Sequence, residues 1–524
     1  MRASLPGNLT RGVLTLALTT FAGTAAIRPV QAATQLPTGF SEQTVVSGID
    51  RPTSLTVLPD GRVLVTEQHT GRIKLVVGNT LVATPLVIVS QQANSAEERG
   101  LLAIAVDPRW PASPYVYVHH TRTTDQQRLL RYTATGDLTT GTSTNLTLGS
   151  EYTVMDGITD ASTTHNGGTL RFGSDSLLYW SLGDDNVSCL AQDSTSLHGC
   201  VMRLEVRNLQ AGAGGPPART LLVPSSNPFA QSANVNVRLV YNYGLRNPFR
   251  FQLDPASRLV YVADVGEDTW EELDELGPGA NAGWPYREGP ALFSPSGCSE
   301  PGGAGKNAYA APIDSYDHNE GIVIIAAGVF RYALRPTNWP PGWDGNVFYA
   351  DYYAGFMRML HRGVTGWARA TAPGQPDPEY WATGLDYPVD FQWGLDGNLL
   401  WVSQYNSTGT GVTGSLRRIL ATTPLDVGNA SPAVRLALSG APNPTRGTVD
   451  LRFELPHAGH ATVAVFDLAG RRLASLQDGP MGAGTHHLIW DGRGTGGHLV
   501  AAGMYLARLD LDDAAVTTRI LRVQ

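Results

Sequence analysis

A histidine and an aspartate nineteen positions apart are the residues whose types and spacing best suit catalysis. His165 stands in THNGG (164–168) before an apolar strand, and Asp184 ends the strand that returns from the turn at Ser174-Asp175. Both should therefore reach the same edge of one β-hairpin. A carboxylate beside an imidazole fixes the tautomer and raises the basicity of the ring, as a general base requires. The alternative is a turn histidine bonded to the backbone, with Asp184 capping the loop.

An arginine enters the next hairpin from the same edge. It is Arg246, in the segment GLRNP (244–248). A guanidinium in that position is suited to stabilise a developing oxyanion. The alternative is a structural ion pair between Arg246 and a neighbouring acid.

Two acid-rich segments are further candidates. In DVGEDTWEE (264–272), carboxylates beside a glycine suit a hard cation that is held by carboxylate and main-chain oxygens. The spacing is not that of an EF-hand, so a solvated loop is the alternative. In EERGLL (97–102), the alternative to a site is a charged turn before a buried strand.

Other kinds of site have no sequence signal. The chain contains no P-loop, zinc-type His/Cys spacing or GxSxG segment. Charged residues make up 16% of the 524 residues, the net charge is −8, and the only lysines are Lys74 and Lys306. This balance argues against a nucleic-acid partner. Any anion site must use arginine or backbone N–H groups.

The candidate residues are carried by an internal repeat. Six times, an apolar strand, a tight turn and a second apolar strand are followed by a third strand rich in Arg or Leu; the turn aspartates are Asp60, Asp107, Asp175, Asp254, Asp344 and Asp396. Such antiparallel units bury both faces when they pack radially. We therefore predict an all-β fold, a six-bladed β-propeller over residues 40–421. The uneven spacing of the turns places long, functional insertions in blades three to five.

A second, smaller domain is predicted after the propeller. Residues 422–439 have the composition of a linker. Residues 440–524 contain short alternating strands at the turn spacing of a small β-sandwich.

The N-terminus, residues 1–33, has the pattern of an export signal. Arg2 and Arg11 precede the apolar stretch 13–26, and Val30-Gln31-Ala32 offers a cleavage site. An uncleaved anchor helix is the alternative. No later segment is long enough to cross a bilayer.

Export implies an oxidising compartment, where cysteines pair. Cys189 and Cys200 lie eleven positions apart, so we predict a disulfide between them, which leaves Cys298 unpaired. Three buried thiols are the alternative.

Five segments, in this order along the chain, resemble the glucose/sorbosone dehydrogenases. They are ERGLLAIAVDP (98–108), HNGGTLRFGSDSLLYWSLGD (165–184), GLRNPFRFQLDP (244–255), DVGEDTWEELDEL (264–276) and NAGWPYREG (281–289). These are soluble sugar dehydrogenases, dependent on calcium and pyrroloquinoline quinone (PQQ), with a six-bladed propeller. The resemblance covers most of residues 40–420 and implies the same fold.

The resemblance also implies roles for individual residues. His165 would take the proton of the sugar's anomeric hydroxyl, and Asp184 would orient the imidazole. Arg246 and Asn247 would lie beside the quinone, with Arg246 stabilising an anionic oxygen. Main-chain oxygens of Gly266 and Glu267 would hold calcium, which polarises the quinone as a Lewis acid.

Several positions depart from the family pattern around the cofactor. Glu98 stands where a cofactor-contacting Gln is common. One cation expected in blade five and two expected in blade six fall near Tyr353, Tyr387 and Val389. Each charge-assisted bond contributes about 1.5–3 kcal/mol, so the loss lowers the expected affinity for a tricarboxylate unless other arginines compensate.

The C-terminal residues resemble FlgD-like immunoglobulin domains and the sorting domains of secreted bacterial proteins. The resemblance rests on Asn443-Pro444, Phe466-Asp467, Gly470-Arg471, Trp490-Asp491-Gly492 and Gly503-Met504-Tyr505. It implies export, with attachment to the cell surface as a further expectation.

The leading hypothesis is a secreted, periplasmic or cell-surface dehydrogenase that uses PQQ and Ca²⁺. It would oxidise an aldose or a sugar-derived alcohol by hydride transfer and pass electrons to an unknown acceptor. A non-catalytic surface propeller that binds glycan or protein is the alternative, because the expected clamp cations are missing. A calcium-dependent lactonase or hydrolase propeller is the third hypothesis.

Overall fold

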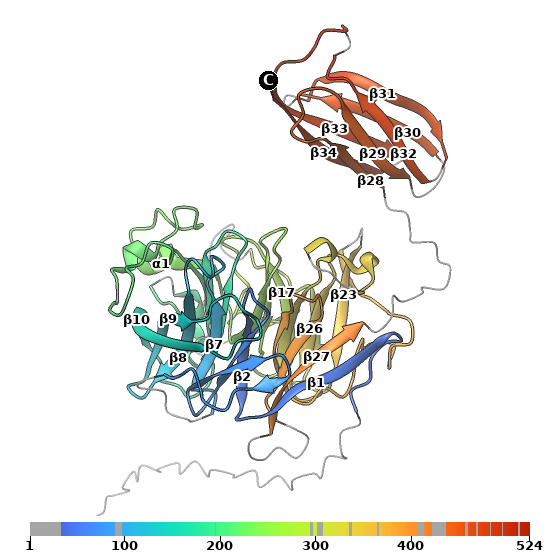
Figure 1. Cartoon of the computed structure of the whole chain (residues 1–524). Helices are drawn as coiled ribbons and strands as arrows, with labels where there is room; N and C mark the ends of the chain where they lie inside the picture. Colours follow the sequence, from blue (N-terminus) through green and yellow to red (C-terminus); the bar gives the residue numbers. More distant parts are fainter. Residues whose placement is uncertain are drawn as a thin grey trace, which may run out of the picture. The chain divides into compact units, whose positions relative to one another are not determined.

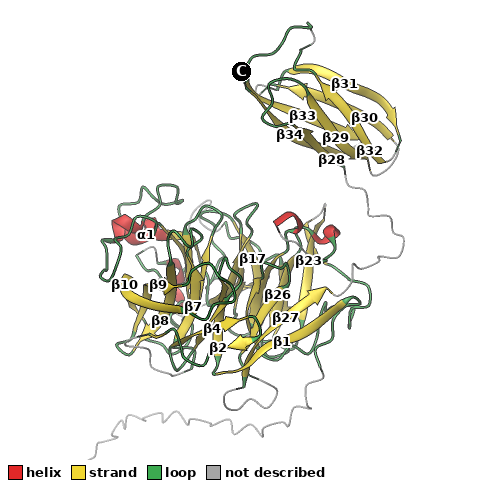
Figure 2. Ribbon diagram, viewed as in Figure 1, coloured by secondary structure: helices red, strands yellow, loops and turns green. Residues whose placement is uncertain are grey.

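The chain divides into two compact units, one formed mainly by residues up to Thr422 and the other mainly by those from Thr423. The computed structural model describes residues 33–523, except 90–96, 194, 294–296, 301–307, 335–337, 364–365, 406–412, 422–435, 456–458, 468–469, 483, 495 and 512–513. Both units consist mainly of strands (Figures 1 and 2). The predicted export signal, apart from Ala33, and most of the predicted linker lie outside the described residues.

The first unit is a six-bladed propeller, as predicted, and each blade is one antiparallel sheet. From the innermost strand outward, blade one has β2 (Pro52–Val57), β3 (Val63–Glu67), β4 (Arg72–Val77) and β5 (Thr80–Leu81), with β6 (Val87–Ile88) beside β4, and blade two has β7 (Leu101–Val106), β8 (Tyr115–Arg122), β9 (Gln126–Gly136) and β10 (Leu146–Thr159). Blade three has β11 (Thr169–Phe172), β12 (Leu178–Leu182), β13 (Cys200–Leu204) and β14 (Val240–Tyr243), and blade four has β15 (Pro248–Leu253), β16 (Val260–Asp264), β17 (Trp270–Leu276) and β20 (Asp314–Asp317). Blade five has β21 (Ile324–Val329), β22 (Val347–Asp351), β23 (Met357–Gly363) and β24 (Gly366–Arg369), and blade six has β25 (Pro388–Trp393), β26 (Leu399–Ser403), β27 (Gly414–Ala421) and β1 (Phe40–Ile49).

The first strand of the chain closes the last blade. Strand β1 pairs antiparallel with β27, from Phe40 opposite Ala421 to Ile49 opposite Gly414. The innermost strands then contact one another in a closed ring: β2, β7, β11, β15, β21, β25 and back to β2. This arrangement gives every blade a neighbour on both faces.

The inner hairpins form where the repeat predicts them. In five blades the turn is held by an aspartate that accepts the backbone N–H two residues further on: Asp60, Asp107, Asp175, Asp254 and Asp396. The second strands, β3, β12, β16, β22 and β26, are buried along their whole length because both faces of each sheet are covered. The strands therefore read as short continuous apolar runs.

A buried arginine closes the centre of the ring. The guanidinium of Arg250 donates to main-chain oxygens of four blades, those of Thr53 (2.6 Å), Gly168, Phe249 (2.7 Å) and Val389 (2.7 Å). Burial lowers the pKa of Arg250 to about 10, so the group stays charged at neutral pH. These bonds tie non-adjacent blades together across the axis.

Asp390 extends this central network. It accepts hydrogen bonds from Ser54 Oγ at 2.8 Å and Leu55 N at 3.1 Å, and it pairs with Arg171. A small cavity of about 240 Å³ adjoins it, lined by the far ends of the innermost strands, for example Thr56 and Gln392. Arg171, the partner of Asp390, is also one of the residues that line this cavity.

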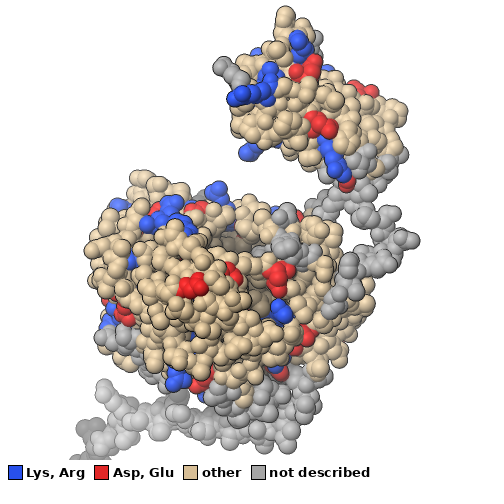
Figure 3. Space-filling view, in the orientation of Figure 1, with Lys and Arg blue, Asp and Glu red and all other residues tan. Residues whose placement is uncertain are grey.

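Helices and short strands occupy the insertions. They are η1 (Ser188–Gln192), η2 (Arg219–Leu222), α1 (Val235–Leu239), β18 (Arg287–Glu288), β19 (Ala291–Leu292), η3 (Tyr332–Leu334) and η4 (Pro341–Trp343). No helix among the described residues is long and apolar enough to cross a membrane. On the face shown in Figure 3, charged side chains are scattered between large uncharged areas, which agrees with the low charged fraction.

The second unit is a two-sheet β-sandwich, as predicted. One sheet has the order β28 (Ala437–Ala441), β29 (Val449–Leu455) and β32 (Gly484–Trp490); the other has the order β31 (Arg472–Met481), β30 (Gly459–Phe466), β33 (Gly503–Leu511) and β34 (Ala514–Arg522). Its core includes Phe453, Val463 and Trp490. Strand β28 begins within the predicted linker, three residues before the predicted domain start at 440.

The predicted Cys189–Cys200 disulfide is wrong. Cys189, on η1, is bonded to Cys298 in the blade-four insertion, with a Cα–Cα distance of 5.7 Å. Cys200 is a free, buried thiol on β13, whose Sγ donates to Leu197 O at 3.1 Å. The physical reason is its place in a buried strand: Cys200 is opposite Leu182 in the blade and packs in the core. Burial raises the pKa of Cys200 to about 12, so the thiol stays protonated.

Candidate functional site

The structure joins His165 to Asp184 at the start of blade three. His165 Nδ1 lies 2.7 Å from Asp184 Oδ1, and only 8% of His165 and 1% of Asp184 are exposed. An ionised carboxylate can only accept, so Nδ1 carries the proton and Nε2 keeps its lone pair. The pair has the arrangement of a general base that is oriented by an acid.

Glycines allow the backbone of His165 to take an unusual conformation. His165 has φ of +60°, in the left-handed region that few non-glycine residues adopt. Its carbonyl oxygen packs against Gly183, where a Cβ would lie 2.1 Å from that oxygen. A side chain at residue 183 would therefore push the strand end that carries Asp184 away from the imidazole. The hydrogen bond between His165 and Asp184 depends on this close approach.

Trp284, from the blade-four insertion, binds the other oxygen of the same carboxylate. Its Nε1 donates to Asp184 Oδ2 at 2.9 Å, and the backbone N–H of Asn186 donates to Oδ1 at 2.9 Å. The Trp284 ring is buried, and the guanidinium carbon of Arg246 lies 5.7 Å from its centroid. One indole therefore contacts both the acid and the arginine of the site.

Arg246 forms an ion pair with an acid, which is the alternative that the sequence left open. Its Nε donates to Glu267 Oε2 at 2.7 Å, Nη2 binds the same oxygen, and Nη1 donates to Val265 O at 3.0 Å. The carbonyl of Arg246 accepts the N–H of Asp184 at 2.8 Å. The histidine, the aspartate and the arginine thus belong to one connected site.

Glu98 connects the entrances of blades two, three and four. Its Oε2 accepts the N–H of His165 at 2.8 Å and Nδ2 of Asn247 at 3.2 Å. Asn247 Oδ1 accepts the N–H of Gly167 at 3.0 Å. The charged-turn interpretation of Glu98 is therefore incomplete, because its carboxylate orders the backbone of His165.

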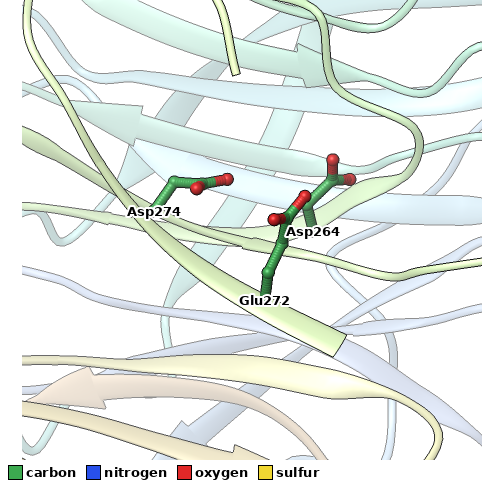
Figure 4. A group of neighbouring side chains, drawn as sticks. All are labelled: Asp264, Glu272 and Asp274. Atoms are coloured by element: carbon green, nitrogen blue, oxygen red, sulfur yellow. The ribbon is translucent and has the colours of Figure 1, made fainter. Parts of the chain in front are cut away.

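Asp264 holds the backbone of the arginine segment in place. Its two oxygens accept the N–H groups of Arg246 (2.8 Å) and Asn247 (2.7 Å). Glu272 and Asp274 lie beside it on β17, with one oxygen of each of the three within 4.8 Å of the others (Figure 4). All three are buried, so the solvated-loop interpretation is wrong for Asp264 and Glu272.

Burial and mutual repulsion disfavour three negative charges at this cluster. Burial raises the pKa of Asp264 to about 7, although the backbone N–H groups of Arg246 and Asn247 lower it. Burial and the neighbouring carboxylates raise the pKa values of Glu272 and Asp274 well above the ordinary range. Protons relieve this repulsion, and carboxylate oxygens are also the ligands that a hard cation prefers.

A carboxylate orders the loop that was predicted to hold calcium. Glu288 Oε1 accepts four backbone N–H groups, from Glu267 (2.8 Å), Asp268 (2.8 Å), Thr269 (2.9 Å) and Trp270 (3.3 Å). The C=O of a trans peptide points opposite to its N–H, so the carbonyls of Gly266 and Glu267 point away from Glu288. Two main-chain oxygens of the kind that bind calcium thus face away from Glu288, while the Glu267 carboxylate is occupied by Arg246.

A cavity of about 550 Å³ opens beside these residues. Part of its wall comes from the predicted site residues Glu98 and Asn247, and from Thr164 and Val265, which are next to His165 and Gly266 in the sequence. The other predicted site residues are not among the described residues that line it: His165, Asp184, Arg246, Gly266 and Glu267. The rest of the wall includes Arg51, Gln68, His69, Tyr352, Tyr353, Gln404 and Tyr405. Volumes of about 300–1,000 Å³ are typical of small-molecule sites.

Tyrosines occupy the region where the resemblance implies cations. The ring centroid of Tyr387 lies 5.3 Å from that of Tyr352, 6.2 Å from that of Tyr353 and 5.8 Å from that of Tyr405. The third position, Val389, is buried, and its carbonyl is bound by Arg250. Among the described residues that line the cavity, Arg51 is the one arginine, and there is no lysine.

The structure brings together most of the residues that the sequence singled out. His165, Asp184, Arg246 and Asn247 form one hydrogen-bonded group, and Glu98 lies against it. Trp284 was missed as a site residue, although it lies in NAGWP, one of the segments that carry the resemblance. No sequence pattern marked Arg51 as a residue of the cavity, because a single arginine before a strand has no distinctive spacing.

Comparison with known protein families gives two matches. The model of the family described as "Glucose / Sorbosone dehydrogenase" matches residues 49–360. The model described as "FlgD Ig-like domain" matches residues 441–514.

Among curated proteins, HIPL1 protein of Arabidopsis thaliana is 33% identical over 210 residues, which cover 36% of this chain and 29% of that protein. Quinoprotein glucose dehydrogenase B of Acinetobacter calcoaceticus is 26% identical over 348 residues, which cover 62% of this chain and 66% of that protein. The chain thus spans less than a third of the length of HIPL1.

Solved structures share the propeller. The PQQ-bound form of aldose sugar dehydrogenase from Streptomyces coelicolor has a TM-score of 0.53 and 24% identity, with 74% of this chain and 99% of that chain covered. The apo-form of soluble aldose sugar dehydrogenase from Escherichia coli has a TM-score of 0.55 and 19% identity, with 72% and 99% covered. At these identities the likeness shows the fold.

Proposed function

The chain belongs to the glucose/sorbosone dehydrogenase family, and from this premise we propose that it oxidises an aldose or a sugar-derived alcohol. The hydrogen bond between His165 Nδ1 and Asp184 Oδ1, at 2.7 Å beside a cavity of about 550 Å³, is the observation that carries this proposal. It leaves His165 Nε2 as the proton acceptor of the site. The substrate hydroxyl loses its proton to Nε2 while its carbon loses a hydride, and a carbonyl group forms.

The remaining residues of the site support this proton transfer. Asp184 stabilises the imidazolium that forms, as it holds the proton of Nδ1 throughout. Trp284 and the N–H of Asn186 keep that carboxylate in place. Arg246 lies beside them as the positive group, and its ion pair with Glu267 reduces the net charge of this part of the site.

The residues that are present fit a planar, carboxylated quinone. The cavity has a suitable volume and is lined by amide, phenol and aromatic groups, with Asn247 on one wall. Its lining also includes the guanidinium of Arg51 and the carboxylates of Glu97 and Glu98. Carbonyls of Gly266 and Glu267 fit calcium, because the Glu288 carboxylate draws their peptide N–H groups to the other side. When bound, PQQ supplies the two-electron hydride acceptor and calcium polarises it.

A non-catalytic binding propeller is the second candidate. It is favoured by the tyrosines at positions 353 and 387, since aromatic rings at a cavity wall and next to it also suit glycan or protein recognition. This candidate predicts a cavity that binds saccharide without oxidising it.

One experiment separates the two candidates. The purified chain is supplied with PQQ and Ca²⁺, and reduction of a dye is followed with a panel of aldoses. We expect turnover that falls by about 10²–10⁴-fold in His165→Ala but not in His361→Ala, an exposed histidine of blade five. Binding of PQQ by calorimetry should survive both changes. Saccharide binding without PQQ binding or dye reduction would instead support the binding propeller.

The location of the protein is part of the same proposal. The signal-like N-terminus and the FlgD-like domain at 441–514 support export, and in this proposal the sandwich attaches the protein to the cell surface. Fractionation of the producing cell, followed by N-terminal sequencing of the mature chain, tests both points.

A further inference from the structure

Arg51 places a positive charge on the cavity wall with no acid paired to it. It lies in the turn between β1 and β2, and among the described residues no carboxylate lies within ion-pair distance of its guanidinium. This distinguishes it from Arg246, whose charge is matched by Glu267. A half-buried guanidinium beside a cavity, without a counter-charge, is suited to bind an anionic ligand.

Two neutral groups hold the guanidinium at the wall. Arg51 Nη1 lies 2.5 Å from His69 Nδ1, and the guanidinium carbon lies 5.7 Å from the ring centroid of Tyr405. Burial, followed by the charge of Arg51, lowers the pKa of His69, so the imidazole is neutral and Nδ1 accepts. Both neighbours orient the arginine and bring no negative charge to it. The Asp50 carboxylate acts on both neighbours but forms no ion pair with Arg51 among the described residues.

The acids of the same cavity are engaged elsewhere. Glu97 Oε2 accepts the hydroxyl of Thr163 at 2.6 Å, and Glu98 Oε2 accepts from His165 and Asn247. The backbone of Arg51 is itself in the left-handed region, with φ of +46°. An arginine held in a strained conformation at a cavity suggests a functional role.

Arg51 also lies on the side of the cavity where the resemblance implies cations and this chain has tyrosines. Its guanidinium stacks on Tyr405, whose ring contacts Tyr387, and Tyr387 contacts Tyr353. A chain of rings thus leads from Arg51 to the blade-five and blade-six positions where the resemblance implies cations.

We propose that Arg51, supported by His69 and Tyr405, is the anion clamp of this cavity and binds a carboxylate of the quinone cofactor. The clamp is supplied from blade one, in place of cations in blades five and six. This inference rests on the proposed function, because it takes the quinone as the ligand. Arg51 binds the cofactor and takes no part in the oxidation of the sugar.

The test measures PQQ binding by calorimetry on the full chain, with Ca²⁺ and without sugar. We expect Arg51→Gln to weaken binding by roughly 10- to 100-fold, the loss of one charge-assisted bond. Arg51→Lys should recover part of the affinity, since the charge remains but the planar contact with Tyr405 is lost. The matched control is Arg258→Gln, an exposed arginine that also has a left-handed backbone (φ +64°) and lies in the turn between β15 and β16.

A second ligand separates a direct contact from a structural effect. PQQ trimethyl ester lacks the carboxylate charges, so the original chain and Arg51→Gln should bind it equally. Equal loss of affinity for the acid and the ester would overturn the clamp, as would unchanged binding of PQQ by Arg51→Gln. If the unsubstituted chain binds no PQQ at all, the proposed function fails together with the clamp. Failure of the clamp alone leaves PQQ binding and turnover intact.

Discussion

Trp284 donates its indole N–H to Asp184 Oδ2 at 2.9 Å, on the carboxylate whose other oxygen binds His165. The two residues are 100 positions apart. Asp184 follows the inner hairpin of blade three, and Trp284 comes from the blade-four insertion. The orientation of the proposed base therefore depends on an aromatic side chain that does not itself exchange protons. This relationship leads to the first prediction.

Trp284→Phe should lower kcat by roughly 10- to 100-fold with little change in KM for the sugar. The ring is retained, but Asp184 loses a donor, and a hydrogen bond to a charged group contributes about 1.5–3 kcal/mol. Steady-state dye reduction measures the effect. Trp367→Phe is a matched control, because Trp367 Nε1 also donates to a carboxylate, that of Glu275, away from the site. Equal losses in both variants would show that Trp284 acts only on stability.

Two buried histidines should make the propeller less stable in mild acid. Burial lowers the pKa of His119 to about 4 and that of His120 to about 3, so both are neutral in the folded state. Below the unfolded value of about 6.5 the unfolded chain binds more protons, and stability falls as the pH falls. His119 alone should account for about 2–3 kcal/mol between pH 6.5 and 4.5.

Urea unfolding at several pH values measures this slope. His119→Gln should flatten the dependence, whereas His361→Gln, at an exposed position, should leave it unchanged. A variant at residue 119 with the full original slope would contradict the assignment.

Replacing the central arginine should destabilise the whole ring. Arg250→Met removes the group that binds four carbonyls and lies 3.9 Å from Asp390. Loss of one member of a buried charged network costs about 3–5 kcal/mol, so the urea midpoint should fall sharply. Arg258→Met, at an exposed turn, should change it little. The idea fails if both variants unfold at the same urea concentration as the original chain.

The disulfide can be checked by mass spectrometry and by unfolding. Alkylation of the unreduced, denatured chain should label Cys200 alone, and digestion should give a peptide pair that contains Cys189 and Cys298. The bond closes a loop with a sequence separation of 109, so Cys189→Ser with Cys298→Ser should cost about 2–5 kcal/mol. Labelling of Cys298 without reduction would rule the bond out.

The parts of the fold that local sequence determines were predictable. Each inner hairpin has apolar strands around a turn aspartate, and the aspartates accept the expected backbone N–H groups, as Asp60 and Asp175 do. The hydrogen bond of His165 to Asp184 was predictable for the same reason, since one hairpin brings both residues to its edge.

The missed features depend on contacts between distant segments. Cys189 pairs with Cys298, which lies in a distant insertion. The spacing of the cysteines in the sequence does not show that Cys200 is buried on β13. Trp284 reaches Asp184 only after the blade-four insertion folds back, and Arg51 meets Tyr405 only when the first and last blades are adjacent. Periodicity contains no information about such pairs.

The pairing of β1 with β27 has a consequence for biogenesis. Synthesis delivers Phe40 to the nascent chain long before its partner Ala421 exists, so no intermediate that ends before β27 can complete the last blade. The ring of blades therefore stays open until translation has passed β27, the last strand of the propeller.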